Sequence, residues 1–521
     1  MKNLLVATVL TAATAATAQN APFVQCLQTA LSNDTSTWML PNDPMFLQGD
    51  VHPYNLNYNV VPAAISFPKT QEQVSEVVKC ANAAGVAVQA RSGGHSYANY
   101  ALGGFNGSLV VDMKNMASFL YNEGDHTVTF GPGNLLGNIS EKLLPLKRVM
   151  AYGEVAVIGT GGHLTIGGLG TLSRQLGVGA DQIVSAQCVL ANGTAVTASA
   201  TTNPDLFFAI RGAGFSFAIV TEFTMKTAPA PTEITKYAYT IAADDANAFA
   251  STFQKWQKFG TQKNLDRRFS STMTLSQGSM VINGNFYGPK SDFDKLNAQS
   301  ILPANTSTVV VDITVGELPF PGLGDPDLTA SGSFPIPFYA KSVKTPSHKL
   351  LSDEAIKSMF SYINGTEKGA PVWLVIWDLE GGAIADVPQT ATAYWHRDAA
   401  YFMQSYVVNL GGPVTDASKT FLSGLSSLVQ KETCDQGAYP GYVDPELADP
   451  QQAYWGGNVP RLQQIKAAVD PDNVFRNPQS VPTQHQAQQR RQVFVGSAVQ
   501  SYAGRFGLLI SCILLAAILY I

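Results

Sequence analysis

The pattern of apolar and polar residues predicts a strand–helix–strand unit near the start of the chain. Residues Val60–Phe67 are typical of a strand, and Val86–Ala90 form a second strand-like run. Between them, Thr70-x-x-Gln73 has the form of a capping box that begins a helix. The apolar residues of this helix, which ends at Gly85, recur at helical spacing: Val74, Val77, Val78 and Ala81. This order indicates that an α/β or α+β layer begins near residue 58.

After about Thr227 the pattern changes to alternating strand-like runs separated by helical stretches such as Ala246–Phe259. The runs are Ile234–Ile241, Ser279–Tyr287, Val309–Val315 and Val372–Leu379. Alternation over this length is typical of strands with one buried face. The second half of the chain is therefore expected to form a separate domain of sheet plus helices.

Both ends of the chain carry patterns of their own. Residues 1–18 resemble a secretory signal peptide, with Lys2, an apolar stretch from Leu4 to Leu10 and a small-x-small site before Gln19. The chain finishes on an uncharged apolar run, Phe506–Ile521. This run fits a glycolipid-anchor signal, a retained membrane helix or a docked tail. A secreted or cell-surface protein follows from these patterns, and the first two of these interpretations would bring residues 496–521 to a membrane.

Composition and charge exclude several classes of protein. Of the 521 residues, 14% are charged and 45% are apolar, which excludes a disordered chain and indicates a large core. The length favours two to four domains. A net charge of -5 provides no basic surface for a phosphate backbone, so no nucleic-acid partner is expected.

The cysteines and sequons agree with secretion. Cys512 lies in the apolar tail, and a disulfide between Cys26 and Cys80 is predicted among the four others, because an oxidising compartment favours one. No Cys-x-x-Cys or close His/Cys set suggests a metal site. Six Asn-x-Ser/Thr sequons are candidate glycosylation sites: Asn33, Asn106, Asn138, Asn192, Asn305 and Asn364.

Glycine clusters in three segments of the first half, residues 92–104, 159–170 and 212–214. Glycines let the backbone approach a ligand closely and present consecutive N–H groups to a phosphate. His95, in the first segment, faces either a bound ligand or solvent. The six glycines of residues 159–170 favour close approach to a large cofactor.

Other enzyme classes find less support. Gly131-Pro132-Gly133 and Gly137 have the wrong spacing for a nicotinamide-binding fingerprint. The sequence contains no Gly-x-Ser-x-Gly elbow of a hydrolase. Asp378 and Glu380 share one strand face, which we interpret as a solvated face.

Five motifs in order resemble the berberine bridge enzyme-like flavoproteins, of the vanillyl-alcohol oxidase type of FAD-linked oxidases. They are RSGGHSY (91–97), GTGGHLTIGGLG (159–170), NPDLFFAIRGAGFSFAIVT (203–221), YPGYVD (439–444) and the segment from YWGGN to VP (454–482). The resemblance extends over residues 26–482. It implies an α+β fold in which residues 19–228 and a returning segment, 437–482, form a two-part FAD-binding domain. Residues 229–436 would be an inserted substrate domain of antiparallel sheet and helices, and residues 483–495 a stalk.

The resemblance also implies how FAD is held. His95 would form a covalent bond to the flavin. The other cofactor-binding residues would be Arg91, Ser92, Gly93, Gly94, Ser96, Gly159, Thr160, Gly161, Gly162, Gly168, Ile219, Val220, Tyr454 and Asn458. Many members add a second bond from a Cys, where this sequence has Val155. Val155 predicts a monocovalent flavin and slightly favours a natural-product substrate over a sugar.

The implied catalytic residues are Tyr442, as the base, with Tyr406 and Gln404 over the flavin. Gly441 replaces the Asn that the family motif has before this Tyr. A phenol ionises near pH 10, so Tyr442 is expected to need a pKa lowered by cations or by the flavin. Tyr401 is either a site residue or ordinary strand packing, and His163 is expected to be structural.

The resemblance thus implies a monomeric enzyme that transfers hydride from an alcohol, sugar or natural product to FAD, and then to O₂. The alternatives are a dehydrogenase or oxidative cyclase that reacts poorly with O₂, and a surface flavin-binding protein without turnover.

Overall fold

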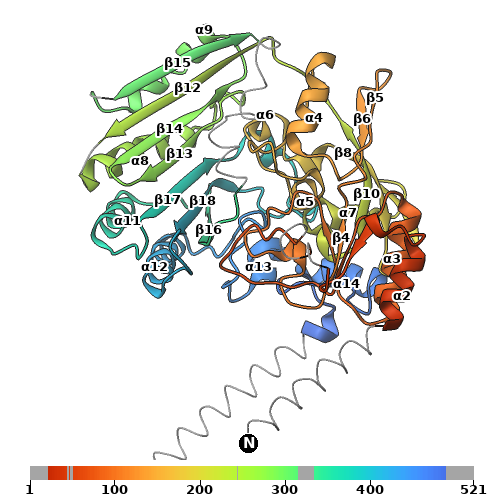
Figure 1. The fold of residues 1–521 in the computed structure, drawn as a ribbon. Helices are drawn as coiled ribbons and strands as arrows, with labels where there is room; N and C mark the ends of the chain where they lie inside the picture. Colours follow the sequence, from red (N-terminus) through yellow and green to blue (C-terminus); the bar gives the residue numbers. More distant parts are fainter. Residues whose placement is uncertain are drawn as a thin grey trace, which may run out of the picture.

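Two systems of sheets lie side by side, one built from the first 230 residues and one from residues 233–408 (Figure 1). The computed structural model describes residues 21–43, 46, 51–242, 245–304, 306–314 and 334–487. The predicted signal peptide, the apolar tail and Asn305 lie outside the described residues. The mixed helices and antiparallel sheets confirm the predicted α+β class.

The first sheet has the order β1-β2-β4-β3, and α3 connects its parallel strands. Its strands are β1 Trp38–Met39, β2 Ala64–Ser66, β3 Val88–Arg91 and β4 Leu109–Asp112. Helix α2 (Ala21–Ala30) packs on α3 (Gln71–Ala83). A disulfide joins Cys26 to Cys80 between these two helices, which confirms the predicted pair.

The strand–helix–strand prediction is confirmed, with shorter strands. Thr70 caps α3 as predicted, because its hydroxyl accepts the N–H of Gln73 at 3.3 Å. The Gln73 side chain accepts from the N–H of Lys69 at 2.7 Å, one residue before the one a capping box would use. Strand β2 begins only at Ala64, after Pro62, a residue without an N–H for a ladder.

A five-stranded antiparallel sheet, order β5-β6-β10-β8-β9, completes this half together with the pair β7 and β11. The strands are β5 Phe119–Asn122, β6 Thr127–Phe130, β7 Arg148–Val149, β8 Ile183–Val189, β9 Ala195–Ser199, β10 Ile219–Lys226 and β11 Ala228–Pro229. The helices are α4 Leu136–Leu143, α5 Thr160–Thr165, α6 Ser173–Leu176 and α7 Pro204–Ala213. Their apolar side chains form one large buried cluster that includes Phe130, Phe223 and Trp455.

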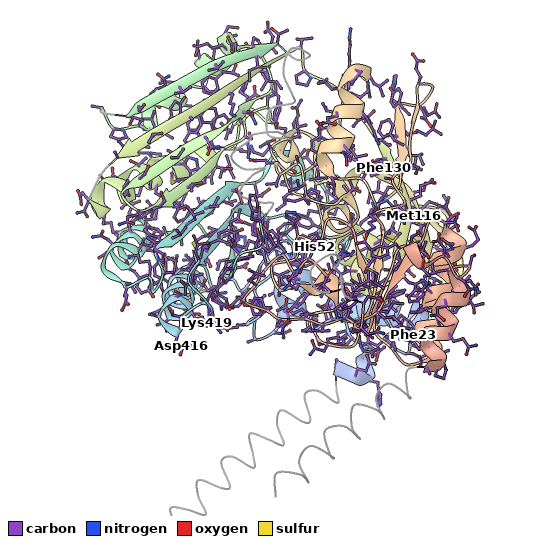
Figure 2. The ribbon with its side chains drawn as sticks, viewed as in Figure 1. Phe23, His52, Met116, Phe130, Asp416 and Lys419 are labelled. Atoms are coloured by element: carbon purple, nitrogen blue, oxygen red, sulfur yellow. A yellow bond between two sulfur atoms is a disulfide. The ribbon has the colours of Figure 1, made fainter. Side chains whose placement is uncertain are left out.

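The second half is a seven-stranded antiparallel sheet, order β15-β12-β14-β13-β17-β18-β16. Its strands are β12 Glu233–Ala242, β13 Thr272–Ser276, β14 Ser279–Phe286, β15 Ser307–Thr314, β16 Phe338–Pro346, β17 Val372–Leu379 and β18 Ala399–Val408. Its helices are α8 Ala246–Gly260, α9 Lys290–Lys295, α11 Asp353–Gly365 and α12 Asp416–Thr433. Figure 2 labels Asp416 and Lys419 on α12, on the side of the molecule away from Phe23 on α2. Apolar side chains of α8, α11 and α12 cover one face of this sheet, which leaves the other face for the site described below.

The C-terminal segment returns to the first half, where α13 (Pro450–Trp455) and α14 (Val459–Val469) lie near the N-terminal strands and helices (Figure 1). The Lys466 ammonium and the Asp470 carboxylate form an ion pair at 2.6 Å, with both side chains fully buried. Lys466 also donates to the carbonyls of Ser216 and Phe475 at 2.6 and 2.8 Å. These acceptors satisfy the buried ammonium, and the bond to the Ser216 carbonyl fixes the returning segment against the first half.

Among the described residues, no helix is long and apolar enough to cross a membrane. In the same residues, no group of three or more His, Cys, Asp or Glu side chains could hold a metal ion.

Candidate active site

A cavity of about 870 Å³ lies between the two sheet systems. Its walls come from the loop after β3, the segment before α5, the start of β10, the open face of β17 and β18, and residues 439–443. This volume is at the upper end of the range of ligand pockets, about 300 to 1,000 Å³. The cavity is therefore large enough for a substantial ligand.

The two glycine-rich loops meet in backbone-to-backbone contact at one wall. A Cβ on Gly93 would lie 2.3 Å from the Gly159 nitrogen, and a Cβ on Gly159 would lie 2.0 Å from the Gly93 nitrogen. Ser92 links the loops as well, because its hydroxyl donates to the Pro132 carbonyl and accepts the Gly161 N–H. Only glycine fits at these two positions.

This wall suits an anionic group. Within the described residues, the N–H groups of Gly93, Gly94 and His95 have no protein acceptor. Gly94 has a φ of +75°, the left-handed region that glycine favours. Successive N–H groups in such a turn form an anion-binding concavity. The wall therefore fits a pyrophosphate such as that of FAD.

The His95 side chain lines the same cavity, with its ring centroid 4.5 Å from that of Tyr54. Burial lowers the pKa of His95 to about 4. The imidazole is thus neutral at pH 7 and has a free nitrogen lone pair, as an attack on an electrophilic carbon requires.

The structure brings most of the predicted cofactor residues to the cavity and places others behind it. The residues that line it are Ser92, Gly93, Gly94, His95, Ser96, Gly159, Gly161, Gly162, Val220 and Tyr454. The residues outside the lining are Arg91, Thr160, Gly168, Ile219 and Asn458.

Each residue behind the wall has a local reason for its place. Arg91 is buried and donates to Asp112 at 2.6 Å, directly before the glycine loop. Ile219 faces the opposite side of β10 from Val220, because successive residues of a strand alternate. The Asn458 amide donates to two carbonyls, of Gln389 and Thr392, both at 3.0 Å. These side chains position the site from outside.

Thr160 and Gly168 likewise support the loop that they belong to. The Thr160 hydroxyl donates to the Asn134 carbonyl at 2.9 Å, and the Gly168 N–H donates to the Tyr439 hydroxyl at 3.2 Å. The Nε2 of His163 accepts the N–H of Gly153 at 2.9 Å, which supports the expected structural role, and its side chain also lines the cavity. Val155 lines the cavity next to this turn.

A hydrogen-bonded network occupies the end of the cavity formed by β17 and β18. The Tyr97 and Tyr406 hydroxyls bond to each other, and Tyr406 donates to the Gln404 side-chain oxygen. The Gln404 amide then donates to Asp378 at 2.9 Å. The Tyr442 hydroxyl donates to the same carboxylate oxygen at 3.0 Å. Two of the three predicted catalytic residues therefore bond to Asp378 directly, and Tyr406 connects to it through Gln404.

Asp378 is the functional residue that the sequence interpretation missed. The interpretation of Asp378 and Glu380 as a solvated strand face is wrong, since both line the cavity and Glu380 is only 5% exposed. Their shared face was predicted correctly, but alternation alone does not show which face of a strand meets solvent. The signal for a site was the presence of two carboxylates at the end of an otherwise apolar strand.

The electrostatics of the network differ from the expectation for Tyr442. Burial, and then the nearby Asp378 carboxylate, raise the pKa of Tyr442 well above its usual value. Burial also raises the pKa of Asp378 to about 6, although hydrogen bonds from Tyr442, Gln404 and Thr272 act against it. The group that can accept a proton near neutral pH is thus Asp378. Tyr442 is the phenol that donates a hydrogen bond to it.

Three aromatic or basic side chains on or just before β18 lie away from the cavity. Tyr401 is buried in the core and donates to Gln257 at 2.7 Å, because odd-numbered residues of β18 face the covering helices. The Arg397 guanidinium forms an ion pair with Asp181 at 2.7 Å. His396 is buried, 1% exposed, outside the cavity lining.

Comparison with known proteins agrees with this geometry. Residues 62–199 match the FAD binding domain family, and residues 438–482 match the berberine and berberine-like family. The FAD-linked oxidoreductase sorD of Penicillium rubens is 35% identical over 466 residues, which cover 88% of this chain and 98% of sorD. This chain belongs to the berberine bridge enzyme-like family of FAD-linked oxidoreductases.

Sugar oxidases are among its relatives in this family. The xylooligosaccharide oxidase of Thermothelomyces thermophilus is 33% identical, and the match covers 91% of this chain and 97% of the oxidase. The solved structure of a chitooligosaccharide oxidase superposes with a TM-score of 0.81 at 29% identity and covers 89% of this chain and 100% of that one. These matches confirm the family that the five motifs indicated and its FAD-binding fold.

Replacement of Gly159 by Ala should disrupt the contact between the two loops. The new Cβ would overlap the backbone of Gly93, which cannot move away as a flexible side chain could. We expect Gly159→Ala to lower the melting temperature and the FAD content of the purified berberine bridge enzyme-like protein. Gly365→Ala, at the end of α11, is the matched control, because a Cβ there meets nothing within 4 Å. A Gly159→Ala protein with wild-type stability and flavin content would contradict the contact.

Proposed function

We propose that this protein is a secreted FAD-dependent oxidase that converts a hydroxyl-bearing carbon of a small molecule to a carbonyl and reduces O₂ to H₂O₂. The observation that carries the proposal is the Tyr442–Asp378 pair in the same cavity as the two glycine loops and His95. A proton acceptor and a candidate flavin attachment point thus line one cavity. The names of the related sugar oxidases support the reaction type.

FAD, when bound, would accept the hydride from the substrate carbon and pass the electrons to O₂. The loops of residues 92–96 and 159–162 would hold its pyrophosphate, and Val220 and Tyr454 would contact it from β10 and α13. His95 would hold it covalently, and Val155 stands where a second, cysteine link would arise. The related glucooligosaccharide oxidase of Acremonium strictum has a 6-S-cysteinyl, 8α-N1-histidyl FAD. In the present protein the proposed link is the histidyl one alone.

The chain's own residues would move the hydroxyl proton. As the carbon loses hydride, Tyr442 takes the substrate's hydroxyl proton and gives its own to Asp378, 3.0 Å away. This relay needs no free phenolate, which the raised pKa of Tyr442 disfavours. Gln404, which donates to Asp378, and Tyr406, which donates to Gln404, hold the carboxylate in place.

Secretion is part of the proposal. The predicted signal peptide, the disulfide between Cys26 and Cys80 and the sequons support it. All five sequon asparagines among the described residues are exposed: Asn33, Asn106, Asn138, Asn192 and Asn364. We further propose a monomer whose tail, residues 496–521, serves as an anchor signal or a membrane segment.

Oxygen uptake tests the reaction type. We expect the purified, yellow protein to consume O₂ and release H₂O₂ when it oxidises a substrate without an added electron acceptor. Rapid anaerobic bleaching of the flavin together with negligible O₂ uptake would instead indicate a dehydrogenase or oxidative cyclase. A colourless protein would indicate that the fold does not carry flavin here.

Acid precipitation tests the covalent bond. The wild-type pellet should stay yellow, whereas His95→Ala should release its FAD into the supernatant. His348→Ala is the matched control, because that side chain is 71% exposed, at an ion pair outside the cavity. A colourless wild-type pellet would refute the covalent link.

The pH dependence of anaerobic flavin reduction tests the relay. The reactive form of Asp378 is the carboxylate, so the rate should fall as the pH drops through about 6. Asp378→Asn should remove this acidic limb, and Tyr442→Phe should slow reduction about 10²-fold with FAD still bound. Asp386→Asn, an exposed carboxylate paired with Arg267, should change neither. If Asp378→Asn kept the wild-type pH profile of flavin reduction, the base would be another group.

A further inference from the structure

The open face of the seven-stranded sheet presents its side chains to the cavity in cross-strand rows. The register pairs Ile376 with Gln404, Leu374 with Tyr406, and Val372 with Val408. Directly opposed residues point to the same face of a sheet, and all six of these side chains line the cavity. The rows therefore form an ordered series from the depth of the site to its mouth.

The inner end of this series is polar. Thr272 pairs with Asp378 on one side and with Asn283 on the other, and all three line the cavity. The next row contains Gln404 beside Ile376. Hydrogen-bonding groups are thus concentrated where the proposed proton transfer takes place.

The outer rows are apolar. Val372 and Val408 form a row with Phe338 of β16, and Leu410 and Ile336 continue the lining. In the Leu374 row, the Tyr406 hydroxyl is already bonded to Tyr97 and Gln404. Within the described part of the chain, no charged side chain belongs to these outer rows.

The apolar surface continues to solvent at the mouth. Leu410 is 68% exposed and Val372 is 42% exposed, and both belong to the lining. Adjacent exposed apolar side chains at a cavity mouth are typical of a ligand-binding groove. The six residue steps from Val372 to Asp378 span roughly 20 Å at about 3.4 Å per residue. A ligand as long as this would meet the polar rows at its inner end and the apolar rows at its outer end.

An oligosaccharide would fit these rows poorly. Its hydroxyls would leave water for a surface of Leu, Val and Phe side chains, and each hydroxyl left without a partner weakens binding. Phe338 could stack on a sugar ring as well as on an aromatic one, so aromatic residues do not distinguish the two classes. The scarcity of polar partners in the outer rows distinguishes the two classes of ligand.

We infer that the substrate is amphipathic, with one hydroxyl at the Asp378 end and an apolar chain or ring system along Leu374, Val372 and Val408. These three side chains then determine specificity. The inference rests on the proposed function for the place of the hydroxyl. It goes beyond that function by assigning the rest of the substrate to an apolar class and by excluding oligosaccharides.

Calorimetric titration measures this preference without turnover. The probes are 4-methyl-, 4-pentyl- and 4-octylbenzyl alcohol, compared with cellobiose and cellotriose, on the flavin-loaded protein with its flavin already reduced, under anaerobic conditions. Each added CH₂ should tighten binding of the alcohols about two- to fourfold. The heat-capacity change of binding should become more negative with chain length, as burial of apolar surface requires. Cellotriose should bind no more tightly than cellobiose.

Two variants locate the effect. In the wild type, the affinity should rise from the methyl to the pentyl probe. Leu374→Asn should reduce this affinity ratio at least tenfold. Val372→Asn, at the exposed mouth, should weaken the binding of the longest probe only. Because Val372 is exposed, this loss of affinity is unlike the effect of misfolding. Val309→Asn is the matched control: Val309 is 55% exposed on the edge strand β15 and lies outside the cavity lining.

The outcomes separate this inference from the proposed function. Affinity that does not depend on chain length, or that rises from cellobiose to cellotriose, would overturn the apolar assignment while the oxidase activity could stand. Chain-length dependence that survives Leu374→Asn would also overturn it. Failure of the proposed function would appear differently, as a protein without flavin or without O₂ uptake.

Discussion

The contact between the backbones of Gly93 and Gly159 is the constraint on which the site depends. It joins the loop after β3 to the loop before α5, with no space for a side chain between them. The contact fixes where successive N–H groups and His95 stand relative to Val155. The glycine enrichment therefore has two roles, close approach to a cofactor and close approach of one loop to the other.

Opposite this wall, the chemistry depends on a single carboxylate at the end of an apolar strand. Asp378 accepts hydrogen bonds from Tyr442 and Gln404, and burial keeps its pKa near 6. Glu380 lies two residues further on, and burial together with Asp378 raises its pKa well above the usual value. The hydrogen bonds that Asp378 accepts favour its ionised form and oppose the effect of burial.

Much of the fold could be predicted from the sequence, because periodicity and capping are local signals. Strand β17 was predicted with its exact bounds, and the cap of α3 was predicted at Thr70. The site was harder to predict. The positions of Asp378 and Tyr401 depend on which face of a strand the helices cover, and that is decided by residues far away in the chain. The motifs indicated the loop residues well, but they did not separate residues that line the cavity, such as Val220, from neighbours that support it, such as Ile219.

The return of the C-terminal segment has a consequence for biosynthesis. The Asn477 amide donates to Gln89, 388 residues earlier in the chain, and the Trp455 indole donates to the Gly212 carbonyl. At about 5 to 20 residues per second, the ribosome needs roughly 20 to 80 s to supply these partners. The sheet of residues 233–408 is contiguous and can fold in that interval. The half that is synthesised first is thus completed last, and its unfinished apolar surface must be kept from aggregation until the final segment emerges.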